Sequence, residues 1–214
     1  MKIVVIDYGS GNVASVFNAL NQICSLPIVI SNQVEEIKSA SHIVLPGVGA
    51  FNDCIDGLKS NQEFFIELNN QVNNLKKPFL GICVGMQVLA SFGFENGKHQ
   101  GLNWIEGQVE KINNIDKNQD PIRIPHMGWN NIEIEKNNCK LLNLIKINEH
   151  FYFANSYHFI CSDQNNVIAK VDYQGIKINA ILNKENIFAV QFHPEKSSSQ
   201  GLQLLKNFID LAIQ

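Results

Sequence analysis

Long apolar runs are absent from this 214-residue sequence. No stretch reaches the roughly 20 apolar residues that a membrane-spanning helix needs. The apolar run Ile3–Ile6 ends at Asp7, too soon for a signal peptide. A basic excess is absent as well, because the formal net charge is -3 at pH 7. We therefore expect no binding to nucleic acid or to a membrane surface.

Paired cysteine motifs are absent too. The five cysteines are odd in number, lie far apart and show no C-x-x-C spacing. The sequence therefore predicts neither a zinc site nor a redox dithiol. Unpaired cysteines fit a reducing cytoplasm, and we expect no metal and no cofactor. The five are Cys24, Cys54, Cys83, Cys139 and Cys161.

The composition is that of a folded globular chain, with 45% hydrophobic and 17% charged residues. Its length suits one domain over residues 1–214. In the first half, short β-branched runs alternate with amphipathic segments, which predicts an α/β fold with a doubly wound, mostly parallel sheet flanked by helices. The expected strands are 3–6, 27–30, 42–45 and 78–82, with helical spacing at Val13, Val16, Phe17 and Leu20 and again at Phe64, Phe65, Leu68, Val72 and Leu75.

The second half has a different pattern. From about Leu102 onward, strand-like runs replace the alternation, and we expect them to add antiparallel strands to the same sheet. A terminal helix follows the last run. The runs are 151–159, 167–173, 176–182 and 187–192, and the helix carries Leu202, Leu205, Phe208, Ile209 and Ala212.

Cys83 is the candidate nucleophile. It lies between the strand-like segment 78–82 and a helical segment, in the G-x-C-x-G spacing from Gly81 to Gly85, which is the cysteine form of a nucleophile elbow. Side chains at the two glycine positions would collide with backbone in so sharp a turn. A sulfur at a helix N-terminus also favours the reactive thiolate. A buried structural cysteine between two packing glycines would give the same short match.

A candidate base follows the apolar run 187–192. His193 and Glu195 are two residues apart, and in an extended chain such side chains project to the same side. Pro194 favours that extended conformation at His193. A carboxylate beside an imidazole fixes its tautomer and stabilises the imidazolium, as the third member of a catalytic triad does. An exposed histidine at a strand end with an incidental glutamate would look the same.

Together these two motifs resemble class I glutamine amidotransferases, which have a flavodoxin-like fold. Further segments in the expected order, over almost the whole chain, resemble the family of glutaminase subunits of imidazole glycerol phosphate synthase. Independent motifs rarely coincide by chance, so Cys83 is the expected nucleophile. The segments are Asp7-Tyr8-Gly9-Ser10-Gly11-Asn12, Pro46-Gly47-Val48-Gly49-Ala50-Phe51, Pro125-His126-Met127-Gly128-Trp129-Asn130 and 191–197.

The resemblance implies the chemistry of glutamine hydrolysis. Cys83 attacks the side-chain amide of L-glutamine, His193 protonates the departing ammonia and later activates water, and Glu195 holds the ring. The resemblance places the oxyanion donors at the Val84 amide and in the turn that contains Val48 and Gly49. A plain loop between a strand and a helix is the alternative for that turn.

The resemblance also implies a set of substrate contacts. Gln87 and Glu95 are expected to grip glutamine, Glu95 through the substrate ammonium group, although the match at Glu95 is weaker. Asn155 stands where the family usually has histidine, which puts any side-chain role there in doubt. The implied substrate-binding residues are Gly47, Gln87, Glu95, Ser156 and Tyr157.

Free ammonia becomes non-nucleophilic ammonium in neutral water, so a glutaminase that supplies a synthesis needs a bound synthase. The resemblance implies a heterodimer with a β/α-barrel protein that makes imidazole glycerol phosphate and an aminoimidazole carboxamide ribotide. Trp129 would anchor that interface or, equally, lie in the core. The residues expected to face the partner are Asn12, Met127, Trp129, Tyr152 and Lys196.

Three other hypotheses stay open at this point. In the first, the same glutaminase serves another synthase, such as one that amidates a surface sugar, and the Asn155 departure keeps this open. A solitary hydrolase of γ-glutamyl peptides is the second. A catalytically inactive binding subunit is the third, and the intact Cys83, His193 and Glu195 argue against it.

Overall fold

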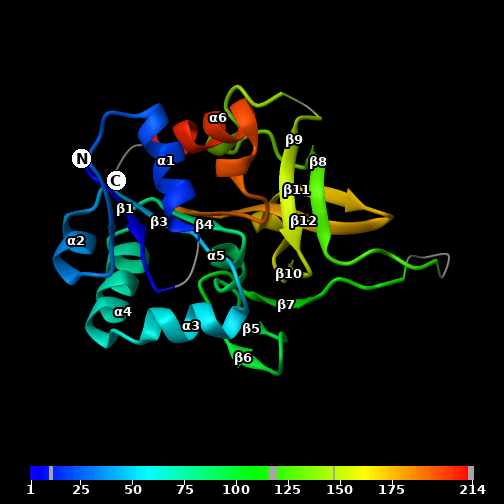
Figure 1. The fold of residues 1–214 in the computed structure, drawn as a ribbon, viewed down its shortest axis with the longest axis horizontal. Coiled ribbons are helices and arrows are strands. Elements are labelled where there is room, and N and C mark those ends of the chain that lie inside the picture. Colours follow the sequence, from blue (N-terminus) through cyan, green and yellow to red (C-terminus); the bar gives the residue numbers. More distant parts are fainter. Residues whose placement is uncertain (10–11, 116–119, 147, 212–214) are drawn as a thin grey trace.

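The computed structural model describes residues 1–9, 12–115, 120–146 and 148–211. Ser10, Gly11 and Ala212, named above, lie outside these residues. A nine-stranded mixed sheet runs through the molecule in the order β2-β1-β3-β4-β13-β12-β11-β8-β9 (Figure 1). Its strands are β1 (Ile3–Ile6), β2 (Ile28–Ser31), β3 (His42–Leu45), β4 (Phe79–Ile82), β8 (His126–Ile134), β9 (His150–Asn155), β11 (Val167–Tyr173), β12 (Ile176–Lys184) and β13 (Ile187–Val190).

Strands β2, β1, β3, β4 and β13 are parallel, and β12, β11, β8 and β9 continue the sheet antiparallel to one another. The predicted α/β class, with antiparallel strands added by the second half, is therefore confirmed. Strands β1, β3, β4 and β13 are buried along their whole length. Strands covered on both faces have continuous apolar runs in place of alternation, which is the pattern that identified them.

Helices cover both faces of the parallel part. Figure 1 shows α1 (Val13–Ile23) and α6 (Ser198–Ile209) on one face and α2 (Val34–Ser39), α3 (Phe51–Lys59) and α4 (Gln62–Asn69) on the other. A π-helical turn, Asn70–Asn74, extends α4. The short elements are α5 (Val84–Gln87) and three 3-10 turns at Lys140–Leu142, Gln164–Asn166 and Pro194–Lys196.

The expectation of a single helix between β3 and β4 is incomplete, because α3 precedes α4 there. The buried residues of α3 are Phe51, Cys54, Ile55 and Leu58. They recur at i, i+3, i+4 and i+7, the spacing of an amphipathic helix that packs one face on the sheet. The signal for α3 was therefore present in the sequence.

The expected strand 151–159 is two strands in two sheets. It breaks at Ser156, whose carbonyl accepts a hydrogen bond from the Ile112 amide at 2.9 Å. The buried positions keep the same two-residue phase on both sides of the break, at Phe151, Phe153, Phe159 and Cys161, so this periodicity could not locate it. After the break, β10 (Tyr157–Cys161) enters a second sheet, in the order β10-β7-β5-β6, with β7 (Gly107–Lys111), β5 (Phe92–Gly93) and β6 (His99–Gln100).

We expect Gly201→Ala in α6 to lower the free energy of unfolding by about 1–3 kcal/mol, the usual cost of overpacking. A Cβ at this position would lie 1.9 Å from the Pro194 carbonyl oxygen, so backbone must move. Urea denaturation measures the change. Ser199→Ala, on the exposed side of the same helix, is the matched control and should stay within about 0.5 kcal/mol. Equal stability of the two variants would contradict the prediction.

Candidate active site

Cys83 lies between β4 and α5 with φ 55° and ψ -110°. Positive φ is rare for residues with a side chain, and such strain, costing about 1–3 kcal/mol, concentrates at functional sites. The Cys83 amide donates to the Val190 carbonyl at 2.8 Å, which fastens the elbow to β13. The backbone conformation of Cys83 is thus set by the sheet.

The glycines around the elbow are required by close backbone approach. A Cβ on Gly81 would lie 2.5 Å from the Gly85 carbonyl oxygen, and a Cβ on Gly85 would lie 2.0 Å from the Leu45 carbonyl oxygen. Gly47 packs against the same turn, where a Cβ would lie 2.5 Å from the Gly85 amide nitrogen. The glycine spacing therefore has the steric cause that the sequence indicated.

The helix after Cys83 is short. Helix α5 has four residues, Val84–Gln87, and so few aligned peptides form only a small helix dipole. The expectation that this dipole activates Cys83 is therefore weak, and the positive charge beside the sulfur has to come from a side chain.

His193 supplies that charge. Its Nδ1 lies 2.9 Å from Glu195 Oε1, and both side chains are almost completely buried. Burial alone lowers the pKa of His193, but hydrogen bonds with Cys83 and Glu195 outweigh it and raise the pKa to about 9. The ring is thus protonated at neutral pH and places a positive charge beside the sulfur.

Two further side chains hold this pair, and nothing in the sequence pattern indicates either contact. Asn12, expected to face a partner, is half-buried and donates its Nδ2 to Glu195 Oε1 at 3.0 Å. Ser197 is fully buried. Its hydroxyl donates to the His193 carbonyl at 2.6 Å and accepts from the Tyr152 amide at 3.0 Å. The His193 amide also donates to the Tyr152 carbonyl at 2.8 Å, so β9 positions the histidine.

A pocket of about 250 Å³ opens beside Cys83 and His193. Every residue expected in the oxyanion turn or in substrate binding lines it, except Gly47, which packs behind the elbow. Lys196, expected to face a partner, lies at the same pocket and is exposed. The lining residues are Val48, Gly49, Cys83, Val84, Gln87, Glu95, Ala154, Asn155, Ser156, Tyr157, His193 and Lys196.

Several polar groups of this pocket already have protein partners. Gln87 is buried, and its Nε2 donates to the Tyr157 carbonyl at 2.9 Å. The buried Asn155 donates its Nδ2 to the same carbonyl at 3.0 Å. The Ser156 carbonyl accepts from Ile112. The carbonyls of Ser156 and Tyr157 therefore serve to build the pocket wall.

Glu95 lines the pocket, and one of its carboxylate oxygens accepts a hydrogen bond from the backbone. Its Oε2 accepts from the Phe51 amide at 2.8 Å, at the first residue of α3. An acidic side chain at a helix N-terminus interacts favourably with the helix dipole. Glu95 thus presents a fixed carboxylate to the pocket, suited to a cationic ligand group.

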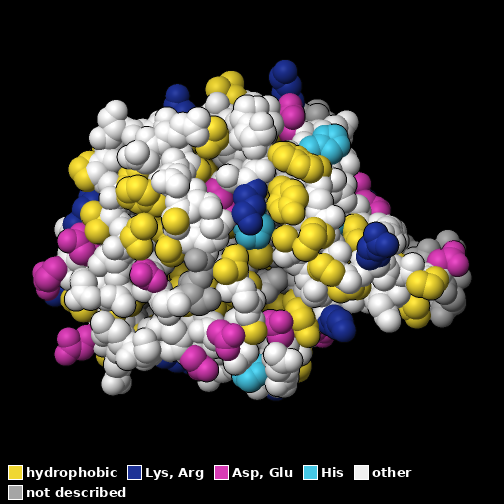
Figure 2. All heavy atoms as spheres, in the orientation of Figure 1, with side chains coloured by type: hydrophobic (Ala, Val, Ile, Leu, Met, Phe, Trp, Pro, Cys, Tyr) yellow, Lys and Arg dark blue, Asp and Glu magenta, His cyan; other side chains and the backbone are white. Residues whose placement is uncertain are grey.

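The remaining residues expected at a partner interface lie on β8 and β9. Met127 and Trp129 are 63% and 53% exposed, so Trp129 is not a core residue. Trp129 and Tyr152 pair across the two strands, with ring centroids 6.1 Å apart. Figure 2 shows hydrophobic side chains gathered over this part of the molecule.

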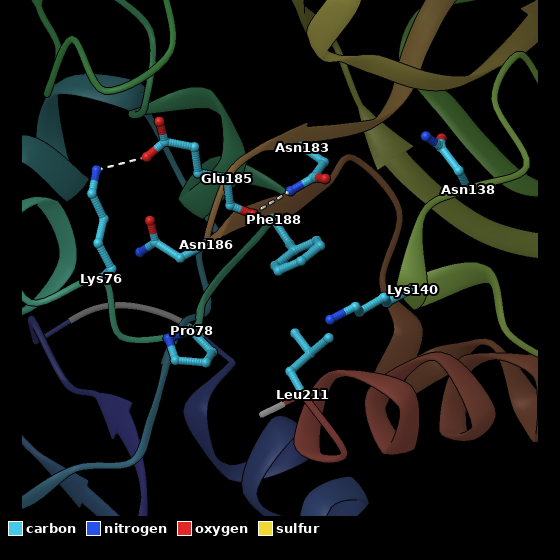
Figure 3. Close-up of a pocket in the computed structure, with 9 residues that line it drawn as sticks. All are labelled: Lys76, Pro78, Asn138, Lys140, Asn183, Glu185, Asn186, Phe188 and Leu211. Carbon is cyan, nitrogen blue, oxygen red and sulfur yellow. Dashed lines mark hydrogen bonds and ion pairs between the residues drawn. The ribbon is translucent and has the colours of Figure 1, made fainter. Parts of the chain in front are cut away.

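Another cavity, of about 170 Å³, lies at the opposite edge of the sheet, where β4 and β13 begin (Figure 3). Lys76 and Glu185 form an ion pair of 2.7 Å at its rim, and Phe188 and Leu211 line its apolar side. The residues that line it include no cysteine, serine or histidine. The pocket beside Cys83 is therefore the candidate active site.

Among the described residues, no group of three histidine, cysteine or acidic side chains is arranged to hold a metal ion. In the same part of the chain, no helix has the length and apolarity needed to cross a membrane.

A model of the family "Glutamine amidotransferase class-I" matches residues 4–211. The chain belongs to this family. It is 40% identical to the imidazole glycerol phosphate synthase subunit HisH of Pelagibacter ubique, over 99% of this chain and 100% of the relative. It is 42% identical to the subunit of that name from Rhodospirillum rubrum, with 98% of each chain covered.

Solved structures agree on the fold of this amidotransferase. A chain in the structure of PurLQS from Thermotoga maritima superposes with a TM-score of 0.70 at 18% identity, over 98% of this chain and 97% of that one. A structure described as a glutamine amidotransferase gives a TM-score of 0.72 at 17% identity, over 97% of both chains.

We expect NMR titration to give His193 a pKa of about 9, and Cys83→Ala or Glu195→Gln to lower it, because each removes a hydrogen bond that raises it. The folded-state pKa exceeds the unfolded value, so this stabilisation is present below about pH 6.5 and is lost as the pH rises through about 9. His126 is an internal control: burial lowers its pKa to about 4, and neither substitution should change it. An unchanged His193 pKa in both variants would show that Cys83 and Glu195 do not raise it.

Proposed function

We propose that this amidotransferase is the glutaminase subunit of an imidazole glycerol phosphate synthase of histidine biosynthesis. It hydrolyses L-glutamine to glutamate and ammonia. The observation that carries the proposal is Cys83, in a strained elbow, beside the protonated His193–Glu195 pair at the wall of a polar pocket. Relatives of nearly equal length carry the synthase-subunit name. Residues 1–214 then form a single amidotransferase domain, because the family match runs from 4 to 211.

The proposed reaction has two halves. The Cys83 thiolate attacks the amide carbon of the glutamine side chain, and the His193 imidazolium gives its proton to the departing nitrogen, which leaves as ammonia. A glutamyl thioester remains. His193, now neutral, takes a proton from water, and the hydroxide attacks the thioester to release glutamate and restore the thiolate. Glu195 keeps Nδ1 protonated throughout, so Nε2 is the nitrogen that exchanges the proton.

The tetrahedral intermediates need hydrogen-bond donors for an oxyanion, and we assign this role to the Val84 amide and to the turn at Val48 and Gly49. These residues line the pocket beside Cys83. Gly49 has φ 93°, a conformation from which a glycine reorients without steric penalty. Loss of one such donor typically costs about 100- to 1000-fold in rate.

For the substrate, we assign Glu95 to the ammonium group and Gln87 to a polar contact through Oε1. The Gln87 nitrogen is already used by the Tyr157 carbonyl. Main-chain contacts from Ser156 and Tyr157 would come from their amides, because their carbonyls are bonded to protein groups. Gly47 acts by allowing the oxyanion turn to approach Gly85.

The ammonia is passed to a β/α-barrel synthase partner, which carries out the lyase and ring-closing chemistry. We propose that Met127, Trp129 and Tyr152 on β8 and β9 meet that partner, together with Lys196 at the pocket rim and the exposed side of Asn12. A surface in contact with the active-site pocket is the place where released ammonia can be covered. No cofactor takes part in this scheme.

The names of the relatives favour this assignment over a synthase that amidates a surface sugar. A solitary hydrolase of γ-glutamyl peptides would be fully active as an isolated chain, so activity with and without the barrel distinguishes the two. A catalytically inactive subunit does not fit the intact geometry of Cys83, His193 and Glu195.

We expect the purified chain to hydrolyse glutamine slowly and to be stimulated strongly by the barrel partner with that partner's ligand bound. In the complex, Cys83→Ala should abolish glutamine-dependent synthesis and leave ammonia-dependent synthesis intact, because the barrel performs the second step. Glutamate release and imidazole glycerol phosphate formation are measured in parallel. Glutamine turnover by Cys83→Ala would contradict the role of Cys83 as nucleophile. A chain whose activity the barrel partner does not stimulate would contradict the proposed place in histidine biosynthesis.

Trp129→Ala should weaken binding of the barrel partner at least about tenfold, as expected for a large exposed aromatic anchor. Titration calorimetry measures the dissociation constant. Ile66→Ala is the control, since Ile66 is 61% exposed on α4, away from β8 and β9. Equal effects of the two substitutions would place the interface elsewhere.

A further inference from the structure

A buried glutamine lies against the nucleophile and has no role in the reaction described so far. Gln191 follows β13 and is fully buried. Its backbone amide donates to the Ala180 carbonyl at 2.9 Å, which fixes the residue to β12. Its side-chain Nε2 lies 3.8 Å from Cys83 Sγ, within hydrogen-bond range for a sulfur acceptor.

The direction of the Gln191 amide follows from its neighbours. Gln87 Nε2 donates to the Tyr157 carbonyl, an acceptor with no hydrogen to give, so this end of Gln87 must be the nitrogen. The same Nε2 donates to Gln191 Oε1 at 3.1 Å. Gln191 therefore has its oxygen toward Gln87, and its nitrogen is the end that faces the sulfur.

We propose that the Gln191 side-chain amide donates a hydrogen bond to the Cys83 sulfur and stabilises its thiolate form, an inference that rests on the proposed glutaminase function. The chain of bonds from Tyr157 through Gln87 and Gln191 to Cys83 links the second sheet to the nucleophile. A donor held in a buried site costs no reorganisation when the charge forms, and hydrogen bonds to charged groups are the strong ones. Helix α5 is only four residues long and has a small dipole. The Gln191 amide takes its place as the group that stabilises negative charge on the sulfur.

Other groups near the sulfur are titratable and have to stay constant in a test. His193 is hydrogen-bonded to Cys83, with Glu195 behind it. Tyr8 is electrostatically coupled to Cys83, and burial raises the pKa of Tyr8, which keeps its hydroxyl neutral. Glu95 and Lys196 line the same pocket. Substitutions at Gln191 leave all of these in place.

The test is the rate at which iodoacetamide alkylates Cys83 in the isolated chain, from pH 5 to 10. Peptide mass mapping separates Cys83 from the other four cysteines, Cys24, Cys54, Cys139 and Cys161. Two variants remove the donor. Gln191→Met replaces the amide with an apolar chain of similar length. Gln191→Leu replaces it with a shorter, branched apolar chain, so neither variant adds a titratable group beside the sulfur. Gln71→Met is the matched control, because Gln71 is also buried but bonds to Glu67.

Both Gln191 variants should alkylate about tenfold or more slowly at pH 7, with the midpoint of the pH profile moved upward and the plateau at high pH retained. Gln71→Met should match the unsubstituted chain. Unmoved midpoints in the Gln191 variants, or equal slowing at every pH, would overturn the proposal. Circular dichroism verifies folding, and Gln191→Leu serves if Gln191→Met does not fold. Because no glutamine is present, this result is separate from the glutaminase assay of Cys83→Ala.

Discussion

The pairing of β4 with β13 is the constraint on which the site depends. These strands come from distant parts of the chain, yet Ile82 pairs with Val190 in parallel register, and the next amide, that of Cys83, bonds to the Val190 carbonyl. Parallel strands end at the same edge of a sheet, so the elbow after β4 and the His193–Glu195 segment after β13 emerge together. A slip of one residue would turn the side chains of β13 to the opposite faces and would separate Gln191 from the sulfur.

The sequence predicted those parts of the site that local geometry determines. The elbow needs Gly81 and Gly85 because backbone passes within collision distance, and a two-residue spacing aligns His193 with Glu195 in an extended segment. Each requirement involves residues only a few positions apart, so it is visible as a short motif in the sequence. Strands β1, β3, β4 and β13 were equally predictable, because burial on both faces demands continuous apolar runs.

The features that sequence reasoning missed depend on contacts between distant segments. The buried positions of β9 and β10 keep the same two-residue phase across the break at Ser156, so this periodicity does not show that the two strands belong to different sheets. The bond from Asn12 to Glu195 spans most of the chain.

Hydrogen bonds connect the surface of β8 and β9 to His193. Tyr152 pairs with the exposed Trp129 on β8, while its own amide and carbonyl hold Ser197 and His193. Asn12 extends this network by donating a hydrogen bond to Glu195. A partner that displaces β9 therefore moves the backbone that carries the imidazole. Since reacting atoms must meet within a narrow range of distance and angle, the rate of the proposed reaction would then depend on what is bound on that surface.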